Sequence, residues 1–261
     1  MNDILLSFIL GLVQGLTEFL PISSSAHLLF PTLIFGSNDL GLYFDISVHA
    51  GTLIAVVYYF RNEIFLMCKS LLVTNNFNED KNLAIQLIIA TIPIVILGFI
   101  FKDLISQRIF SINDIAISNL IFASILLFAF LNNKGKKTLI NITILGACFI
   151  GLFQCFALIP GASRSGAAIT AGLLIGLSLK DASKFAFLLA IPTILGALTL
   201  LIFDLNNQNV SFDLVNISIG FFTSMIFAFF TIKLFLKLVE KIGMIPFVVY
   251  RFLLGILLLI I

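Results

Sequence analysis

Charged residues are scarce in this sequence, because they make up 11% of its 261 residues against about a quarter in an ordinary soluble protein. This scarcity excludes a soluble globular domain, and the 60% hydrophobic content and the mean hydropathy of +1.17 predict a multi-pass helical membrane protein. The net charge of +2 and the lack of nucleic-acid-binding or nucleotide-binding motifs indicate no nucleic acid partner. The three cysteines, Cys68, Cys148 and Cys155, lie in apolar surroundings without metal spacing, so we expect no disulfide framework. The N-terminus has no basic region before its apolar stretch, so we expect residue 1 to remain in the mature chain.

Against this apolar background, polar residues gather between residues 11 and 27, in GLVQGLTEFLPISSSAH. The gathered side chains are Gln14, Glu18, Ser23, Ser24, Ser25 and His27. An unsatisfied polar group in hydrocarbon costs several kcal/mol, so such a cluster is expected only where the backbone breaks around a wet cavity. We therefore predict a functional site here rather than a simple span.

A second stretch, residues 151–166 (GLFQCFALIPGASRSG), repeats this pattern in the other half of the chain. The aligned pairs are Gly11 with Gly151, Leu12 with Leu152, Gln14 with Gln154 and, after deletion of one residue, Pro21 with Pro160, Ser24 with Ser163 and Ser25 with Arg164. We name residues 21–27 (PISSSAH) the first tip and residues 160–166 (PGASRSG) the second tip. Interrupted apolar segments in two halves of a membrane protein point to a shared midplane site. Two Pro-kinked helices with serine caps are the plainer alternative, but they explain neither the repeat nor the charges.

The apolar segments predict an all-α polytopic membrane protein made of two inverted-topology repeats, residues 1–131 and 132–261. Each repeat is expected to hold a re-entrant helical hairpin plus three transmembrane helices, since a span needs about 20 apolar residues. The predicted segments are a hairpin with arms 4–20 and 28–35 and spans at 44–72, 83–101 and 112–131, then a hairpin at 139–177 and spans at 182–203, 214–236 and 243–261.

The positions of the cations predict the orientation in the membrane. This topology places most of them on one side: Arg61, Lys69, Lys81, Lys134, Lys136, Lys137, Lys180, Lys184, Lys233, Lys237 and Lys241. Only Lys102 and Arg108 fall on the other side, and cytoplasmic loops carry the Lys/Arg excess, so the linker 132–137 is expected in the cytoplasm. The two tips then enter from opposite faces and meet within the membrane. Arg164 and Arg251 lie inside apolar stretches, which is costly without a partner or a cavity.

The polar groups that the tips bring together are suited to phosphoryl transfer. A serine beside a histidine supplies a nucleophile and its base, and Arg164 suits a phosphate or a carboxylate. Hydroxyl residues and glycines at a broken helix offer N–H donors to an anion. Glu18, with Gln14 one turn earlier on the same face, is suited to a divalent cation.

Each of these residues also has a plainer interpretation. The serine triplet is compatible with a helix cap, and His27 with a satisfied interfacial histidine. Glu18 is compatible with a buried proton-coupling carboxylate, or with a simple ion pair to Arg164. Asp45 and His49, four residues apart, fit either a helix-surface pair or an outer rim of the site. The joint arrangement of all these groups favours function.

The two polar stretches, QGLTEFLPISSSAH and PGASRSG, resemble the signature motifs of the undecaprenyl-diphosphate phosphatase family, also called the bacitracin-resistance family. The matching residues are Gln14, Glu18, Pro21, Ser23, Ser24 and His27 in the first motif, and Pro160, Gly161, Ser163, Arg164, Ser165 and Gly166 in the second. The resemblance covers nearly the whole chain in length, repeat plan and motif placement.

This resemblance implies a membrane hydrolase that converts undecaprenyl diphosphate to undecaprenyl phosphate and inorganic phosphate, recycling the carrier lipid for peptidoglycan synthesis and conferring bacitracin resistance. Such an enzyme would lie in the bacterial inner membrane with its site open to the outer side, and a homodimer is compatible with it. The family depends on a divalent metal, Mg²⁺ or Ca²⁺, here expected at Glu18 and Gln14. A glutamate often stands at the position of Gln14, so the amide implies weaker metal binding.

The resemblance also implies roles for the remaining site residues. Ser24 would be the nucleophile and His27 its proton partner, although either of them is able to attack phosphorus. Arg164 with Ser163 would clamp the phosphate. The other expected phosphate-binding residues are Ser23, Ser25, Ser165 and Gly166.

Two rival functions remain open from the sequence. The type-2 phosphatidic-acid phosphatase superfamily also acts on lipid phosphates, but its chemistry needs a histidine downstream of the arginine motif, and this chain has only His27 and His49. The other rival is a polyprenyl-phosphate flippase or secondary transporter, because inverted repeats with broken helices are the architecture of such proteins. A transporter would not need a serine nucleophile.

Overall fold

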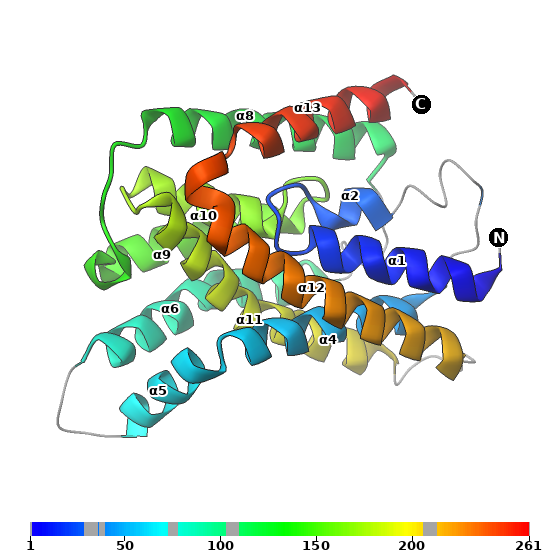
Figure 1. Cartoon of the computed structure of the whole chain (residues 1–261), viewed down its shortest axis with the longest axis horizontal. Helices are drawn as coiled ribbons and strands as arrows, with labels where there is room; N and C mark the ends of the chain where they lie inside the picture. The colour runs from blue at the N-terminus through cyan, green and yellow to red at the C-terminus, as the bar shows by residue number, and fades with distance from the viewer. Residues whose placement is uncertain are drawn as a thin grey trace.

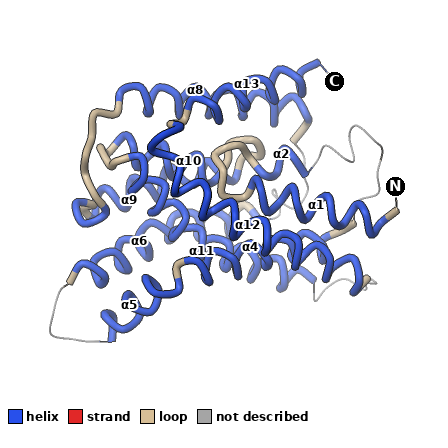
Figure 2. Tube along the Cα trace, in the orientation of Figure 1, coloured by secondary structure: helices blue, strands red, loops and turns tan. Residues whose placement is uncertain are grey.

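The computed structural model describes residues 2–28, 36, 40–72, 78–102, 110–205 and 213–260. Within these ranges the regular secondary structure is helical, apart from an isolated bridge between Lys137 and Leu177 (Figures 1 and 2). The α-helices are α1 (Asp3–Thr17), α2 (Ser24–Leu28), α4 (Leu42–Tyr59), α5 (Arg61–Leu72), α6 (Glu79–Ile100), α8 (Ile112–Asn132), α9 (Ile144–Gln154), α10 (Arg164–Leu174), α11 (Leu179–Leu205), α12 (Leu214–Ile242) and α13 (Ile245–Ile260). Two short 3₁₀ helices, η1 (Leu139–Asn141) and η2 (Cys155–Leu158), flank α9.

Five of the described helices are long and apolar enough to cross a membrane, which confirms a multi-pass membrane protein. They are α4, α6, α8, α11 and α12. The predicted sixth span at 243–261 corresponds to α13, whose 16 residues fall short of the usual length of about 20. The second arm of the first hairpin, 28–35, lies outside the described residues except for Leu28.

The prediction of one continuous helix over 44–72 was wrong, because the chain breaks at Phe60 between α4 and α5. Phe60 leaves helical geometry, with φ −97° and ψ 19°, and its side chain is 1% exposed within the main apolar core. The polar residues that follow, Arg61 and Asn62, are exposed. The span α4 therefore ends at the buried Phe60 ring, and the exposed polar residues after it begin a separate helix, α5.

Helix α12 packs along α1 and α4, and glycines allow this close approach. A Cβ atom added to Gly11 or Gly15 of α1 would lie 2.9 Å or less from a backbone oxygen of α12, and one added to Gly51 of α4 would overlap Ser224. Small residues at such contacts let backbones meet in a membrane, where no hydrophobic driving force acts between helices. This packing fixes the face of α1 that carries Gln14 and Glu18 against the interior.

Helices α8 and α13 lie side by side and form a layer over the two tips (Figure 1). A small apolar cluster of Ala26, Ile115, Ala116, Leu254 and Leu258 joins α2 to this layer. Helix α8 begins with a capping box between Ser111 and Asp114, which satisfies orphan N–H groups of its first turn. The layer thus supports the tips from one side.

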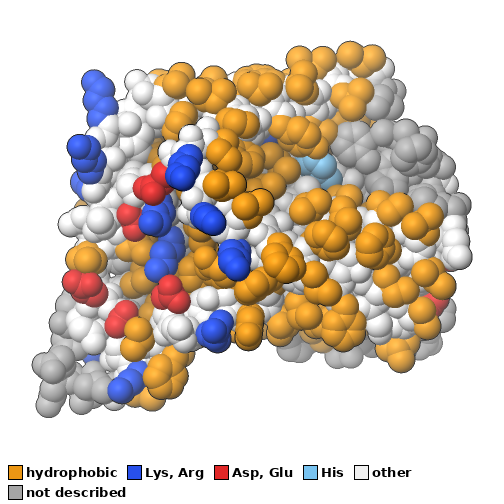
Figure 3. All heavy atoms as spheres, viewed as in Figure 1, with side chains coloured by type: hydrophobic (Ala, Val, Ile, Leu, Met, Phe, Trp, Pro, Cys, Tyr) orange, Lys and Arg blue, Asp and Glu red, His pale blue; other side chains and the backbone are white. Residues whose placement is uncertain are grey.

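The predicted linker 132–137 contacts the end of α10 and the residues that follow it. The Asn133 side chain donates hydrogen bonds to the carbonyls of Leu173 and Leu177, and Lys137 exchanges backbone hydrogen bonds with Gly176 and Ser178. Lysine and arginine side chains gather at the end of the molecule where α5 and α9 lie, while the rest of this face is mostly hydrophobic (Figure 3). This distribution is typical of a membrane protein with one cation-rich end.

Candidate active site

The two tips have the same local backbone geometry. Ser23 and Ser163 both have φ 70°, and they are the only non-glycine residues with positive φ in the described part of the chain. Each of them lies immediately before a helix, which starts at Ser24 in the first tip and at Arg164 in the second. The hydroxyls of Ser23 and Ser25 lie 3.1 Å apart, and those of Ser163 and Ser165 lie 3.2 Å apart.

These shared features correct the sequence alignment of the tips. Ser23 corresponds to Ser163 and Ser24 to Arg164, in the same register that pairs Gln14 with Gln154, without the deletion that paired Ser24 with Ser163. The alignment of Pro21 with Pro160 was wrong, because these prolines lie at different distances from the serine with positive φ in their tips. A positive φ in a non-glycine residue costs about 1–3 kcal/mol and persists only where the surroundings hold it. Both tips are therefore held in the same strained turn.

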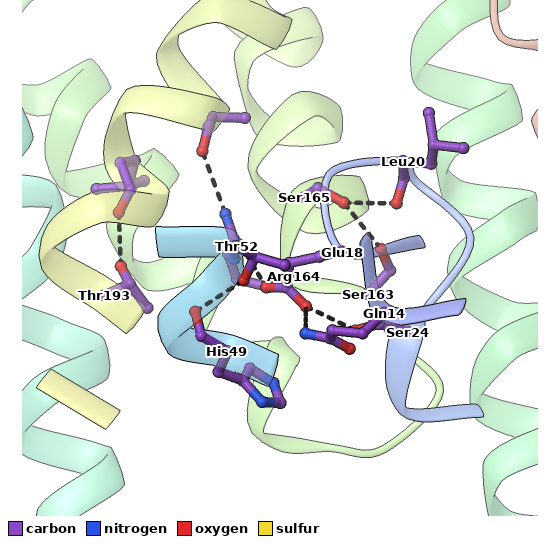
Figure 4. Close-up of polar contacts among 12 residues, drawn as sticks. Gln14, Glu18, Leu20, Ser24, His49, Thr52, Ser163, Arg164, Ser165 and Thr193 are labelled. Atoms are coloured by element: carbon purple, nitrogen blue, oxygen red, sulfur yellow. Dashed lines mark hydrogen bonds and ion pairs between the residues drawn. The ribbon is translucent and has the colours of Figure 1, made fainter. Parts of the chain in front are cut away.

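The Glu18 carboxylate connects the two tips (Figure 4). Its Oε1 accepts a 2.7 Å hydrogen bond from Nη2 of Arg164 in the second tip. Its Oε2 accepts hydrogen bonds from Nε2 of Gln14, at 3.0 Å, and from Oγ of Ser24, at 2.8 Å. Glu18 is 9% exposed, so this acid binds its serine and its arginine with little screening by water.

Arg164 begins α10 and extends between the elements that surround the site. Besides its ion pair with Glu18, its Nη1 lies 3.4 Å from the carbonyl of Ala186 on α11, and its guanidinium lies 5.8 Å from the centre of the Phe19 ring. Planar guanidinium groups bind carboxylate and phosphate in the same fork geometry. An incoming phosphate therefore competes with Glu18 for Arg164.

A cavity of about 260 Å³ opens beside this ion pair. Its polar lining consists of Glu18, Ser23, Ser24, Ser25, His49, Ser163, Arg164 and Thr193. Its apolar lining comes mainly from α6, α11 and η2, through Ile94, Ala157, Leu158, Ile194, Ala197, Leu198 and Leu201. A cavity with one polar wall and one apolar wall fits an amphiphile that has an anionic head and a hydrocarbon tail.

Both ring nitrogens of His27, the predicted proton partner of Ser24, lie beside other polar atoms. His27 Nδ1 lies 2.7 Å from the carbonyl oxygen of Ser23, one turn back, and its Nε2 lies 2.6 Å from the Tyr250 hydroxyl on α13. The two rings also stack, with their centres 5.5 Å apart. The bond to Ser23 turns the imidazole towards α13, so the side chain that accepts the Ser24 proton in a hydrogen bond is Glu18.

Two other residues line the cavity instead of His27. His49 on α4 lines it, as the rim interpretation predicted, and its Nδ1 lies 2.7 Å from the backbone carbonyl of Asp45. Thr193 on α11 also lines it, and the sequence analysis missed this residue. One threonine in an apolar helix carries no local signal, because such hydroxyls usually bond the carbonyl four residues earlier, as Thr193 does with Leu189.

The predicted phosphate-binding residues divide into two groups. Ser23, Ser25, Ser163 and Arg164 line the cavity, whereas Ser165 and Gly166 do not. Ser165 donates its hydroxyl to the carbonyl of Leu20 at 2.8 Å, and the N–H of Gly166 donates to Ser163 Oγ at 3.2 Å. Ser165 and Gly166 thus stabilise the tips rather than face the cavity.

The donor set for the expected divalent cation is small. Among the described residues there is no group of three or more histidine, cysteine or acidic side chains. The Oε1 atom of Gln14 is nevertheless buried without a hydrogen-bond partner, and Gln14 contacts Glu18. An amide oxygen beside a carboxylate suits Mg²⁺ or Ca²⁺, which prefer oxygen ligands and accept water or phosphate for the rest. The residues present therefore fit a cation bound jointly by the protein and an anionic ligand.

Comparison with known proteins finds relatives that match nearly the whole chain. The chain is 45% identical over 256 residues to an undecaprenyl-diphosphatase of Alcanivorax borkumensis, a match that covers 97% of each chain. It is 43% identical over 258 residues to an undecaprenyl-diphosphatase of Saccharophagus degradans, covering 97% of this chain and 96% of that one. The family described as bacitracin resistance protein BacA matches residues 7–257. With both tips and nearly every helix inside that match, this chain belongs to the BacA bacitracin resistance family.

Proposed function

We propose that this chain is a membrane phosphatase that hydrolyses undecaprenyl diphosphate to undecaprenyl phosphate and inorganic phosphate. The relatives named undecaprenyl-diphosphatase support this activity and, with it, carrier-lipid recycling for peptidoglycan synthesis and resistance to bacitracin. The observation that carries the proposal is the chain of contacts from Ser24 through Glu18 to Arg164 on the wall of a half-apolar cavity.

The proposed reaction begins when the terminal phosphate takes the place of Glu18 on Arg164. The freed Glu18 carboxylate becomes a stronger base, and it accepts the Ser24 proton as Oγ attacks the terminal phosphorus. The bond between that phosphorus and the bridging oxygen breaks, and undecaprenyl phosphate leaves. Water then attacks the phosphorus of the phosphoserine, the bond from phosphorus to Ser24 Oγ breaks, and Glu18 returns its proton to that Oγ. Inorganic phosphate leaves with the oxygen and the two protons of the water, while Arg164 stabilises the charge on the phosphoryl oxygens in both steps.

Glu18 and Gln14 are the residues that would hold the divalent cation, Mg²⁺ or Ca²⁺. Such a cation would supply positive charge that neutralises the two phosphates. Ser23, Ser25 and Ser163 would donate hydroxyl hydrogen bonds to the phosphate oxygens, and His27 would hold the first tip in place through Ser23 and Tyr250.

We also propose that the chain consists of two inverted repeats, 1–131 and 132–261, whose re-entrant hairpins carry the tips. The matching backbone geometry of the two tips, at equivalent positions of the repeat, supports this plan. The cation-rich end supports a cytoplasmic location for the linker 132–137, in the bacterial inner membrane, with the site open to the outer side (Figure 3). A homodimer stays a prediction.

The activity is tested by measuring inorganic phosphate released from undecaprenyl diphosphate by purified protein in detergent, with and without a chelator. We expect metal-dependent release by the wild type and none by Ser24→Ala. Ser124→Ala is the matched control, since Ser124 is exposed on α8 and its hydroxyl bonds only Leu120 one turn earlier. Well-folded wild-type protein that releases no phosphate under any metal would replace this proposal with a lipid flippase.

A further inference from the structure

Arg251 on α13 is a fully buried cation outside the cavity lining. Its exposed fraction is 0%, although it is a charged side chain inside a membrane protein. Its side-chain hydrogen bonds in the described part of the chain go to neutral acceptors: Asn119 Oδ1 at 2.7 Å, Pro21 O at 3.5 Å, Gly161 O at 2.9 Å and Ala162 O at 3.1 Å. A buried charge without an opposite charge is costly, so an apolar side chain would be cheaper for folding alone.

The carbonyl groups that Arg251 contacts belong to both tips. Pro21 lies two residues before Ser23, and Gly161 and Ala162 directly precede Ser163. The guanidinium therefore bonds the backbone that leads into each of the two strained serines. Five N–H donors in one plane let a single side chain reach both turns at once. No other described side chain hydrogen-bonds backbone carbonyls of both tips.

Asn119 on α8 holds the guanidinium in place. Its Oδ1 accepts from Arg251 Nε, and its Nδ2 donates to the backbone carbonyl of Arg251, both at 2.7 Å. A Cβ atom added to Gly161 would overlap the carbonyl of Ile115 on α8, so the second tip also packs directly on this helix. Arg251 is consequently locked between α8, α13 and the two tips.

We propose that Arg251 is a positioning residue of the phosphatase site, which ties the two tips together and so sets the placement of Ser24 relative to Arg164. The inference rests on the proposed function, because that function makes the spacing of these two side chains matter. The residues just before the first tip contact the second tip directly, through Glu18 with Arg164 and through Leu20 with Ser165. Arg251 supports these contacts from outside the cavity lining.

The test compares Arg251→Lys with the wild type in phosphate release, with Arg61→Lys as the control on the exposed side of α5. Lysine keeps the charge but lacks the planar fork, so both tips are no longer held together. We expect kcat to fall about 100-fold, because a displacement of about 1 Å at a reacting group has effects of that order. KM for the diphosphate should change less than threefold, since Arg164 remains, and the unfolding temperature should stay near that of the wild type.

A second variant, Asn119→Ala, removes the anchor of the guanidinium without changing any charge. If Asn119 acts only by holding Arg251, the double variant Arg251→Lys/Asn119→Ala has the same kcat as Arg251→Lys alone. Multiplied effects would overturn the proposal, as would wild-type kcat in folded Arg251→Lys protein. If Arg251→Lys does not fold, Asn119→Ala provides the test. Folded Asn119→Ala protein with the kcat of the wild type then refutes the positioning role of Arg251. An inactive wild type in the same assay refutes the proposed function instead. Arg251 is then tested by thermal unfolding with inorganic phosphate, which should raise the unfolding temperature of the wild type more than that of Arg251→Lys.

Discussion

The first and second tips share one backbone geometry and carry different chemistry. In the register that pairs Ser23 with Ser163, the nucleophile candidate Ser24 corresponds to Arg164, and the acid Glu18 corresponds to Leu158. The first tip with its helix thus supplies a hydroxyl and a carboxylate, and the second supplies the cation. Neither tip is therefore a site by itself. The site exists only where the Glu18 carboxylate reaches across to Arg164.

The glutamines before the tips show the same division. Gln14 and Gln154 are both fully buried in the helices before the tips, and each has one amide atom without a hydrogen-bond partner in the described residues. Gln14 contacts Glu18, whereas Gln154 contacts the Thr193 hydroxyl at 3.4 Å. Gln14 therefore lies in a charged environment in the first half, and Gln154 lies in a neutral environment in the second half.

The largest expected effect comes from exchanging the charges of the two tips. Glu18→Arg alone and Arg164→Glu alone each leave like charges buried together and should destabilise the protein by about 3–5 kcal/mol. The double variant restores an ion pair and should recover at least half of that stability in detergent unfolding. Phosphate release should nevertheless stay absent, because the base next to Ser24 has become a cation. Recovery of turnover in the double variant would show that the two tips are chemically interchangeable.

A smaller effect is expected from giving the glutamines a negative charge. Gln14→Glu adds a second carboxylate beside Glu18, so the Mg²⁺ concentration for half-maximal activity should fall about tenfold, equivalent to about 1.4 kcal/mol. Gln154→Glu is the matched change in the second half, where a lone buried carboxylate should lower stability without increasing metal affinity. A titration of activity with Mg²⁺ compares the metal affinities of the two variants. Equal responses of the two variants would contradict the placement of the cation at the first tip.

The smallest effect separates the corresponding serines Ser25 and Ser165. Ser165→Ala removes the buried hydroxyl that donates to Leu20 across the tips and should cost about 1 kcal/mol of stability. Ser25→Ala affects an exposed hydroxyl and should change the free energy of unfolding by less than about 0.5 kcal/mol. Chemical unfolding of both variants in the same detergent provides the comparison. A larger loss of stability in Ser25→Ala than in Ser165→Ala would mean that the serine of the first tip, and not that of the second, stabilises the fold.

Much of the site was predictable because its polar residues stand out in an apolar chain. Glu18, Ser24 and Arg164 were expected together, and the structure joins them by hydrogen bonds. The partner of Ser24 was not predictable, since Glu18 and His27 are both within a few residues of it and only the turn at Ser23 directs the imidazole to Tyr250. The break at Phe60 was missed because Arg61 and the polar residues after it are equally compatible with one helix that continues past the membrane face.

Composition and pattern are enough to predict a helical membrane protein, with two polar interruptions that carry an acid, serines and an arginine. These are local properties, because hydrocarbon penalises each unpaired polar group wherever it occurs along the chain. The hydrogen bond from Ser24 to Glu18, the positions of His49 and Thr193 on the cavity wall and the contacts of Arg251 with both tips follow from the three-dimensional fold. These contacts join residues that are up to 230 positions apart, so they depend on how closely the helices approach one another.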